Sequence, residues 1–350
     1  MVALVEIAGR KVGPGFPCLI VGEAGVNHNG SLEMARRLVD AALQAGVDVV
    51  KFQSFKAERL AASSAPKADY QLSTAGGGES QLEMLRRLEL SETAQKEIKD
   101  YCRQKGILFM STPFDEGSAD FLEGLGVEVF KIPSGEITNL RFLSYVARKG
   151  KPMIVSTGMS SLEEVEAAFR TIRGSGNEQL VLLHCVSRYP TEPAEVNLRA
   201  MATMQGTLQV PVGYSDHTMG ITVALAAVAL GACVVEKHFT LDRSLPGPDH
   251  QASLEPSELA DLVKGIRVVE ASLGHGKKEP TANELGTAAV ARKSLVAAKD
   301  IPAGTKLTEE CITVKRPGTG LPPSMLSQLV GRVAARDISA DTLLSLEMLR

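Results

Sequence analysis

The sequence predicts an eight-stranded β/α barrel, of the TIM-barrel class, followed by a small β-rich domain. Three observations lead to this prediction. Eight short apolar runs alternate with longer segments of helical periodicity over the first 275 residues. Polar and charged residues gather at the carboxyl end of each run. The last 60 residues carry an internal repeat in place of this alternation.

The eight apolar runs are the candidate strands. Their continuous apolar character suits parallel strands that are buried on both faces. An open, doubly wound sheet is the alternative, because periodicity cannot demonstrate that a sheet closes on itself. The runs span residues 17–22, 48–53, 107–111, 128–133, 152–156, 180–184, 210–214 and 232–237.

Helical patterns fill the gaps between these runs. Residues 31–45 have apolar positions at helical spacing and stop at Gly46, a typical residue after a helix end. Ser161 and Glu164 form a predicted capping box at the start of a helix that runs to about residue 173. The segment 55–90 is long for a loop between strand and helix, so we expect it to cover the site.

The predicted organisation is a barrel over residues 1–275, a linker over 276–290 and the second domain over 291–350. Within the second domain, residues 296–307 (VAAKDIPAGTKL) recur as 333–344 (VAARDISADTLL), identical at eight of twelve positions. Two copies so close together predict a small pseudo-symmetric β module whose halves pack on each other.

Bulk composition excludes several classes of protein. The net charge of −3 among 350 residues provides no basic field for nucleic acid. The N-terminus is too short and too charged for a signal peptide, and the most apolar stretch, 221–231, is too short to cross a bilayer. Five cysteines without a CxxC pair are interpreted as reduced core thiols, which predicts a cytoplasmic protein.

Two histidines follow neighbouring strands, His217 after the seventh run and His238 after the eighth. Neighbouring strands lie about 4.8 Å apart, so both imidazoles can reach one metal ion. Nearby acidic and water oxygens suit Mn²⁺ or Mg²⁺ better than structural zinc. Ordinary hydrogen bonding is the alternative for either histidine alone. Asp249 lies in a Pro/Gly-rich loop beside this pair, where it could bind sugar hydroxyls.

A second group of strand-end residues is rich in cations and small hydrogen-bond donors. Such groups suit a bound phosphate and carboxylate. Lys131 could instead be a Schiff-base nucleophile, and either lysine could merely pair with Glu23 or Glu136. We favour the anion site because its members come from several strands: Lys51, Lys131, Ser134, Ser156 and Ser215.

Taken together, these segments resemble the sialic acid synthase family, which makes N-acetylneuraminate and related nonulosonic acids. The matching barrel motifs are GEAGVNHNG (22–30), KFQ (51–53), STPFD (111–115), KIPSGE (131–136), STGM (156–159), LHCVSRYPT (183–191), GYSDHT (213–218), EKHFT (236–240) and DRSLPGPDH (242–250). In the tail, ARKSLVAAKDI (291–301) and VKRPGTG (314–320) resemble the antifreeze-like, or SAF, domain of the family. The ordered set covers nearly the whole chain.

The resemblance implies condensation of phosphoenolpyruvate with N-acetylmannosamine, or a related N-acylated amino-sugar aldehyde, and release of phosphate. It makes His217 and His238 the ligands of a divalent metal, Mn²⁺ first, with Mg²⁺ or Co²⁺ as alternatives. Glu23 is the candidate proton carrier. The residues implied at the phosphoenolpyruvate site are Lys51, Gln53, Thr112, Lys131, Ser134, Ser156, Ser187 and Ser215. Those implied at the sugar are Glu136, Tyr189, Asp249 and Arg316, the last from the partner in a domain-swapped homodimer.

Two departures from the family pattern leave the sugar open. Ser187 stands where N-acetylneuraminate synthases often carry Asn, and Val290 stands where some members carry Phe. Legionaminate synthesis from a 2,4-diacetamido-trideoxy hexose is therefore a close alternative. Pseudaminate synthesis is less favoured because the first loop reads GEAGVNHNG. More remote alternatives are a Schiff-base aldolase and a non-catalytic sugar-binding or ice-interacting protein based on the tail.

Overall fold

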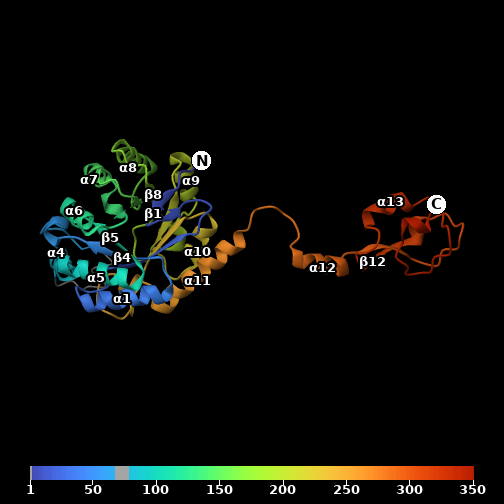
Figure 1. The fold of residues 1–350 in the computed structure, drawn as a ribbon, viewed down its shortest axis with the longest axis horizontal. Coiled ribbons are helices and arrows are strands. Elements are labelled where there is room, and N and C mark those ends of the chain that lie inside the picture. Colours follow the sequence, from blue (N-terminus) through green and yellow to red (C-terminus); the bar gives the residue numbers. More distant parts are fainter. Residues whose placement is uncertain (1, 68–78) are drawn as a thin grey trace. The chain divides into compact units, whose positions relative to one another are not determined.

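The computed structural model describes residues 2–67 and 79–350 and divides the chain into two compact units, Met1–Gly274 and His275–Arg350. In the first unit, eight parallel strands form one sheet in the order β5-β4-β3-β10-β9-β8-β7-β6. The end strands β5 and β6 are in contact, so the sheet is a nearly closed barrel and the open-sheet alternative is excluded (Figure 1). The strands are β3 (Leu19–Gly25), β4 (Val49–Ser54), β5 (Leu108–Pro113), β6 (Phe130–Ile132), β7 (Met153–Ser156), β8 (Leu180–Cys185), β9 (Val212–Asp216) and β10 (Val234–His238).

Several strands continue past their apolar runs into polar residues. Glu23, Ser215 and His238 are ladder residues of β3, β9 and β10, where the sequence pattern had placed the strand ends earlier. The barrel interior accepts them because the carboxyl ends of the strands open into a polar cavity. Strand boundaries in a barrel therefore depend on pairing with neighbours, which the apolar pattern does not record.

Helices surround the barrel and bury their apolar faces against it (Figure 1). The first helix starts at its cap Ser31 and ends at Gly46, whose φ of 81° favours glycine. Ser161 and Glu164 form the predicted capping box of α8. The helices are α1 (Leu32–Ala45), α5 (Glu92–Lys105), α6 (Glu116–Leu125), α7 (Leu140–Ala147), α8 (Leu162–Gly174), α9 (Ala200–Leu208), α10 (Thr222–Ala229) and α11 (Pro256–Leu273), with the shorter α2 (Ala57–Leu60) and α4 (Gln81–Leu88).

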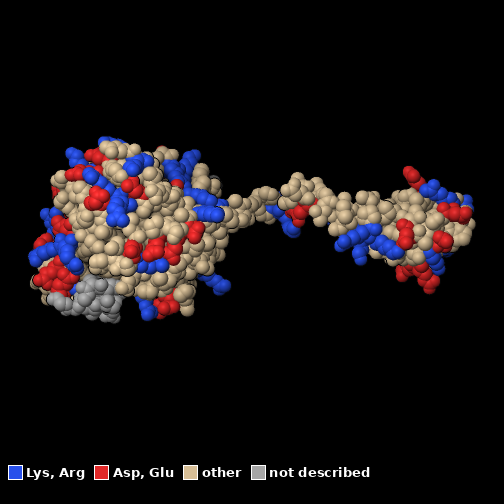
Figure 2. Space-filling model, turned by 90° about the horizontal axis from the view of Figure 1, so that it is seen from below, with Lys and Arg blue, Asp and Glu red and all other residues tan. Residues whose placement is uncertain are grey.

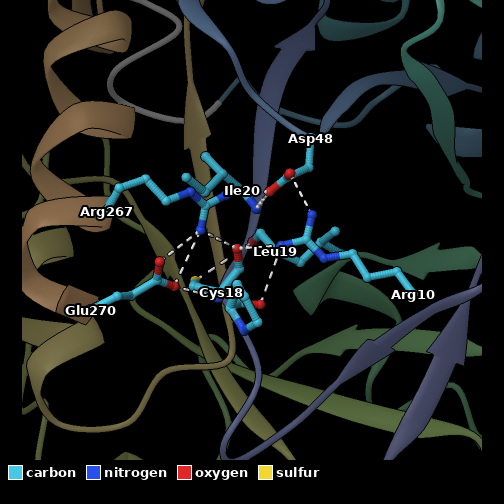
Figure 3. A network of polar contacts seen from close by, with 8 residues as sticks. Arg10, Cys18, Leu19, Ile20, Asp48, Arg267 and Glu270 are labelled. Atoms are coloured by element: carbon cyan, nitrogen blue, oxygen red, sulfur yellow. Dashed lines mark hydrogen bonds and ion pairs between the residues drawn. The ribbon is translucent and has the colours of Figure 1, made fainter. Parts of the chain in front are cut away.

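The amino-terminal end of the barrel is closed by a hairpin that the sequence analysis did not predict. Strands β1 (Val5–Ile7) and β2 (Arg10–Val12) pair antiparallel, and their buried side chains join the core inside the barrel. Beside them, Asp48 accepts hydrogen bonds from Ile20 N (2.8 Å) and Arg267 Nη2 (3.0 Å) and forms an ion pair with Arg10 (Figure 3). This network ties β2, β3, β4 and α11 together at the end opposite the strand carboxyl ends.

The surface shows no single-sign field on the face in view. Lys and Arg alternate with Asp and Glu over that face of the barrel unit (Figure 2), in keeping with the net charge of −3. Among the helices of the described residues, none combines the length and the apolar character that a membrane span requires.

The second unit has a hydrophobic core of its own. The two copies of the repeat run antiparallel, with bridges Val296↔Leu343, Ile301↔Ile338 and Lys306↔Val333. The two isoleucines occupy equivalent positions of the repeat and pair with each other. The bridges on either side of them are related by the exchange of the two copies, which is the pseudo-symmetric packing that the repeat predicts. Strand β11 (Ser294–Ala297) pairs antiparallel with β12 (Ile312–Lys315), and α13 (Leu326–Leu329) follows. Helix α12 (Ala282–Ala291) occupies much of the stretch predicted as a linker.

Candidate active site

A cavity of about 370 Å³ lies at the carboxyl ends of the strands, and all eight strands contribute to its wall. This is the end at which β/α barrels carry their catalytic groups. The structure brings thirteen of the predicted site residues to this one cavity: Glu23, Lys51, Gln53, Thr112, Lys131, Ser134, Ser156, Ser187, Tyr189, Ser215, His217, His238 and Asp249.

Two lysines and two glutamates form the buried floor of the cavity. Lys51 forms an ion pair with Glu23 and lies 3.4 Å from Glu236 Oε2, while Lys131 Nζ lies 3.4 Å from Glu236 Oε1. Ser215 Oγ donates a hydrogen bond of 2.9 Å to the same Glu236 oxygen. The lysines therefore do pair with carboxylates, but Glu236 is the shared partner and Glu136 is not.

Glu236 is the residue that the predicted site omitted. It precedes His238 by two positions on β10, so both side chains point to the same face of the strand. That spacing was the signal that could have identified it.

The environment shifts the pKa values of the two buried glutamates, Glu23 and Glu236, in opposite directions. Burial raises the pKa of Glu23 to about 7, with Lys51 opposing the increase and Glu236 adding to it. Burial would raise the pKa of Glu236 too, but Lys131 and Lys51 together lower it to about 2. Two carboxyl groups whose pKa values diverge in one site are typical of a proton carrier next to a permanently ionised neighbour.

Hydroxyl groups surround the lysines. Lys131 Nζ donates to Ser156 Oγ at 2.7 Å, and Lys51 Nζ donates to Thr112 Oγ1 at 3.1 Å. Ser134 Oγ accepts a hydrogen bond of 2.9 Å from the backbone N–H of Gly158. Ammonium, hydroxyl and backbone donors of this kind can bind the oxygens of a phosphate or a carboxylate.

His217 and His238 face each other across the cavity with ring centroids 5.5 Å apart. Val186 O lies 2.7 Å from His217 Nδ1, so Nδ1 carries the proton in the neutral ring and Nε2 keeps its lone pair. His238 Nδ1 is buried and makes no hydrogen bond to the described residues. Both observations fit imidazoles that bind a metal ion.

The protein offers few further ligands for such an ion. In the described part of the chain, no group of three or more His, Cys, Asp or Glu residues has a metal-binding arrangement. An ion held by two imidazoles would take its remaining ligands from water and substrate, which leaves open positions for chemistry.

The cavity roof is mostly apolar, with Gln81 of α4 as its polar member. Leu60 and Ala61 from the end of α2, and Met84, Leu85 and Leu88 from α4, line the cavity opposite the charged floor. These helices belong to the segment 55–90, so its described parts cover the site as predicted. Residues 68–78 of that segment lie outside the described residues.

The two remaining predicted sugar contacts, Glu136 and Arg316, belong to different units of the chain. Among the described residues, Glu136 is set apart from the lining, and its Oε2 accepts a hydrogen bond of 2.7 Å from Asn139. The turn after β6 brings this carboxylate next to Asn139 at the start of α7, and its role at the sugar stays a prediction. Arg316 is exposed and directly follows β12 in the second unit. Val290, which stands where some family members carry Phe, is exposed on α12.

The sequence matches the NeuB family over residues 38–278 and the SAF domain over residues 292–350. It is 49% identical to the N,N'-diacetyllegionaminic acid synthase of Legionella pneumophila, over 95% of this chain and 94% of that protein. It is 47% identical to the Campylobacter jejuni protein of the same name, over 93% of this chain and 98% of the other. The crystal structure of N-acetylneuraminic acid (sialic acid) synthetase from Leptospira borgpetersenii, in complex with citrate, superposes with a TM-score of 0.73 at 36% identity, covering 82% of this chain and 95% of that one. This chain belongs to the NeuB family, the enzymes that make nonulosonic acids by phosphoenolpyruvate-dependent condensation, and it ends in a SAF domain.

Proposed function

We propose that the enzyme condenses phosphoenolpyruvate with 2,4-diacetamido-2,4,6-trideoxymannose to give N,N'-diacetyllegionaminate and phosphate. The observation that carries the proposal is one cavity that joins the floor of lysines and glutamates, the neighbouring pair His217 and His238, and a mostly apolar roof. Relatives at 49% and 47% identity that are named for this product support the choice of sugar. N-acetylmannosamine, favoured by the motif resemblance, is the second candidate.

The charge of phosphoenolpyruvate is complementary to the two lysines on the cavity floor. Its phosphate and carboxylate are both anionic, and Lys51 and Lys131 line the cavity as ammonium groups that can bind them. Glu236 lies 3.4 Å from each lysine ammonium, so one carboxylate holds both lysines in place on the floor. Hydroxyls from Thr112 and Ser156 complete the set of donors.

His217 and His238 are proposed to hold one divalent ion, with Mn²⁺ preferred and Mg²⁺ or Co²⁺ as alternatives. When bound, such an ion polarises a carbonyl oxygen and stabilises the negative charge that develops on it. An aldehyde that such an ion polarised would bind on the histidine side of the cavity, and Lys51 and Lys131 would bind phosphoenolpyruvate on the other.

The condensation then follows from this arrangement. Carbon 3 of phosphoenolpyruvate forms a bond to the aldehyde carbon, and the aldehyde oxygen accepts a proton. Glu23, whose pKa lies near 7, is our candidate for the donor. Water adds to carbon 2 and gives one proton back to the Glu23 carboxylate. The new hydroxyl on carbon 2 then becomes the keto group as the bond from carbon 2 to the phosphate oxygen breaks, and its proton leaves with the phosphate. Lys131 and the neighbouring hydroxyls stabilise the departing phosphate.

The apolar roof supports the trideoxy sugar. That sugar ends in a methyl group and carries a second acetyl group, whereas N-acetylmannosamine presents hydroxyls at the same positions. Leu60 and Leu85 offer a surface on which a methyl group is buried favourably and a hydroxyl group loses hydrogen bonds to water.

The experiment measures phosphate release from phosphoenolpyruvate with each sugar in the presence of Mn²⁺. We expect turnover with both sugars and a higher kcat/KM for the trideoxy sugar. Chelation should abolish the activity, and His217→Ala should lower it severely. Activity that survives both treatments would contradict the metal proposal, and a preference for N-acetylmannosamine would reverse the choice of sugar.

The Schiff-base alternative predicts a different result. Burial lowers the pKa of Lys131, which would favour a nucleophilic amine. However, its Nζ already donates to Ser156 and lies near Glu236. Borohydride in the presence of pyruvate should leave the protein mass unchanged. A reduced adduct on Lys131 would establish the aldolase instead.

We also propose that the enzyme works in the cytoplasm as a homodimer. All five cysteines are buried and free, which suits a reducing compartment. The dimer rests on the family resemblance and on Arg316, which the resemblance assigns to the partner's site.

A further inference from the structure

A buried ion pair lies directly behind the two histidines. Asp216 and Lys237 face each other as ladder partners of β9 and β10, with Lys237 Nζ 2.7 Å from Asp216 Oδ2. Their side chains are 0% and 1% exposed. Each immediately precedes a histidine in the chain, and successive strand residues point to opposite faces. The histidines therefore face the cavity while the pair faces the outer core, where Tyr214 also packs.

The hydrogen bonds of the pair converge on the backbone next to His217. Asp216 Oδ1 accepts from Thr218 N at 2.9 Å, from Thr218 Oγ1 at 2.8 Å and from Tyr214 OH at 3.1 Å. Lys237 Nζ donates to Thr218 O. Both backbone groups of Thr218 are thus held by the pair, and the chain cannot rotate there without breaking several bonds.

The two histidines need this support to different degrees. The His217 ring is oriented by Val186 O, and its carbonyl oxygen accepts a hydrogen bond of 2.8 Å from Thr191 N. His238 Nδ1 makes no hydrogen bond to the described residues, so its position follows from the strand end that carries it and from the edge contact of its ring with Tyr189, at a centroid distance of 5.7 Å. The relation between the two rings therefore depends on how the ends of β9 and β10 are joined, and Asp216 and Lys237 are the ladder partners at that point.

Stability alone is a weak reason for such a pair. Removing two charges from water costs much of what their attraction gains, and apolar replacements of similar volume are often as stable. A geometric role explains the observed bonds better. We propose that Asp216 and Lys237 are positioning residues that set the spacing and orientation of His217 and His238 for a divalent metal ion. The inference rests on the metal assignment of the proposed function.

The test is a double variant, Asp216→Leu with Lys237→Met, which removes both charges together and leaves neither buried alone. Mn²⁺ affinity is measured from the electron paramagnetic resonance signal of the free ion during titration of the protein. Groups that orient metal ligands typically change metal affinity about 10- to 100-fold, and we expect a loss of that size. Phosphoenolpyruvate affinity, measured by calorimetry without metal, should change less than about threefold, because the lysine floor is untouched.

A matched control lies at the other end of the barrel. Asp48→Asn disturbs a comparable network of ion pairs and hydrogen bonds that joins neighbouring strands far from the histidines (Figure 3). It should lower the melting temperature and leave Mn²⁺ affinity at the wild-type value. A drop in Mn²⁺ affinity in this control would mean that any loss of stability weakens metal binding, and would overturn the inference.

Thr218→Val keeps the inference testable if the double variant does not fold. It removes one donor to Asp216 from a fully buried position and preserves side-chain volume. We expect Mn²⁺ affinity to fall about two- to tenfold, less than the full contribution of a hydrogen bond to a charged group, because Asp216 keeps its bonds to Thr218 N, Tyr214 OH and Lys237. If the double variant or Thr218→Val folds and binds Mn²⁺ as tightly as the wild type, the positioning role is overturned and the metal assignment stands. Equal losses for Mn²⁺ and phosphoenolpyruvate would overturn it as general damage. A wild-type protein that binds no Mn²⁺ would overturn the metal assignment itself.

Discussion

The hydroxyls of Ser134 and Ser187 approach the backbone of Gly158 from two sides. A Cβ atom at Gly158 would lie 2.2 Å from Ser187 Oγ and 2.8 Å from Ser134 Oγ, closer than such atoms can approach. The glycine is therefore required by close packing of the donors at the proposed phosphoenolpyruvate site. No sequence pattern reveals this, because the three residues come from three different strand ends.

Gly158→Ala should displace both serine hydroxyls. Overpacking of this kind costs about 1–3 kcal/mol, so we expect KM for phosphoenolpyruvate to rise about five- to hundredfold. Steady-state kinetics measures the effect. Gly135→Ala is the control, since Gly135 also lines the cavity but a Cβ there meets nothing within 4 Å. Equal kinetic constants for both variants would refute the steric explanation.

Glu23→Gln tests the proposed proton carrier. The amide keeps the volume of the side chain but cannot transfer a proton, so kcat should fall about 10²- to 10⁴-fold. The dissociation constant of phosphoenolpyruvate should change far less. Glu270→Gln is the control, because Glu270 belongs to the network at the opposite end of the barrel (Figure 3). A kcat within threefold of wild type for Glu23→Gln would require another donor.

At the scale of elements, the barrel separates stability from chemistry. The network around Asp48 joins the starts of β3 and β4 to β2 and α11 (Figure 3), and the cavity lies at the other ends of the same strands. Asp48→Asn should lower the free energy of unfolding by about 2 kcal/mol, because hydrogen bonds to a charged group are lost. Denaturant titration measures this loss. We expect kcat to stay unchanged at a temperature well below the unfolding transition of the variant. A large fall in kcat would show that the two ends of the barrel are coupled.

Helix α4 contributes the apolar roof, and its effect on sugar choice can be tested directly. Leu85→Gln places an amide where Leu85 lines the cavity, so the ratio of kcat/KM for the trideoxy sugar over N-acetylmannosamine should fall about tenfold or more. The control is Leu82→Gln on the same helix, which is half-buried and absent from the described cavity lining. A ratio that does not change in Leu85→Gln would remove the roof as a specificity determinant.

For the whole molecule, the proposed contact between Arg316 of the tail and the sugar can be tested by substitution. Arg316 is exposed at the end of β12 in a unit with its own core. Arg316→Ala should raise KM for the sugar about tenfold or more, the loss of a hydrogen bond from a charged donor, and should change KM for phosphoenolpyruvate less. The reverse pattern in steady-state kinetics would argue against a contact with the N-acyl group.

Mixing two variants tests whether that contact crosses between subunits. Lys131→Met lacks the cavity lysine and Arg316→Ala lacks the tail arginine. The assay uses a sugar concentration far below the KM of Arg316→Ala, where each variant alone has little activity. In a domain-swapped dimer, random exchange would give hybrid dimers with one complete site, and about a quarter of wild-type activity should return. If each arginine served its own barrel, no hybrid would have a complete site and no activity would return.

Much of the fold could be predicted from the sequence because its signals are local. The eight apolar runs, the capping box at Ser161 and the repeat in the tail each depend on residues close together in the chain. The β1–β2 hairpin was missed because its strands are only three residues long and too short for a periodic signal. The extension of β3, β9 and β10 into polar residues was missed because it depends on pairing with neighbouring strands.

The sequence by itself determined the barrel, the strand ends that carry polar groups and the pair His217 and His238, since order and hydropathy along the chain encode them. Only the tertiary structure decided that Glu236 bridges Lys51 and Lys131 and that Glu136 points to Asn139 instead. It also decided that Asp216 and Lys237 meet behind the histidines. These contacts join different strands and turns, and their distances follow from barrel register and side-chain direction. Register is a property of paired strands, so no single segment of the chain contains it.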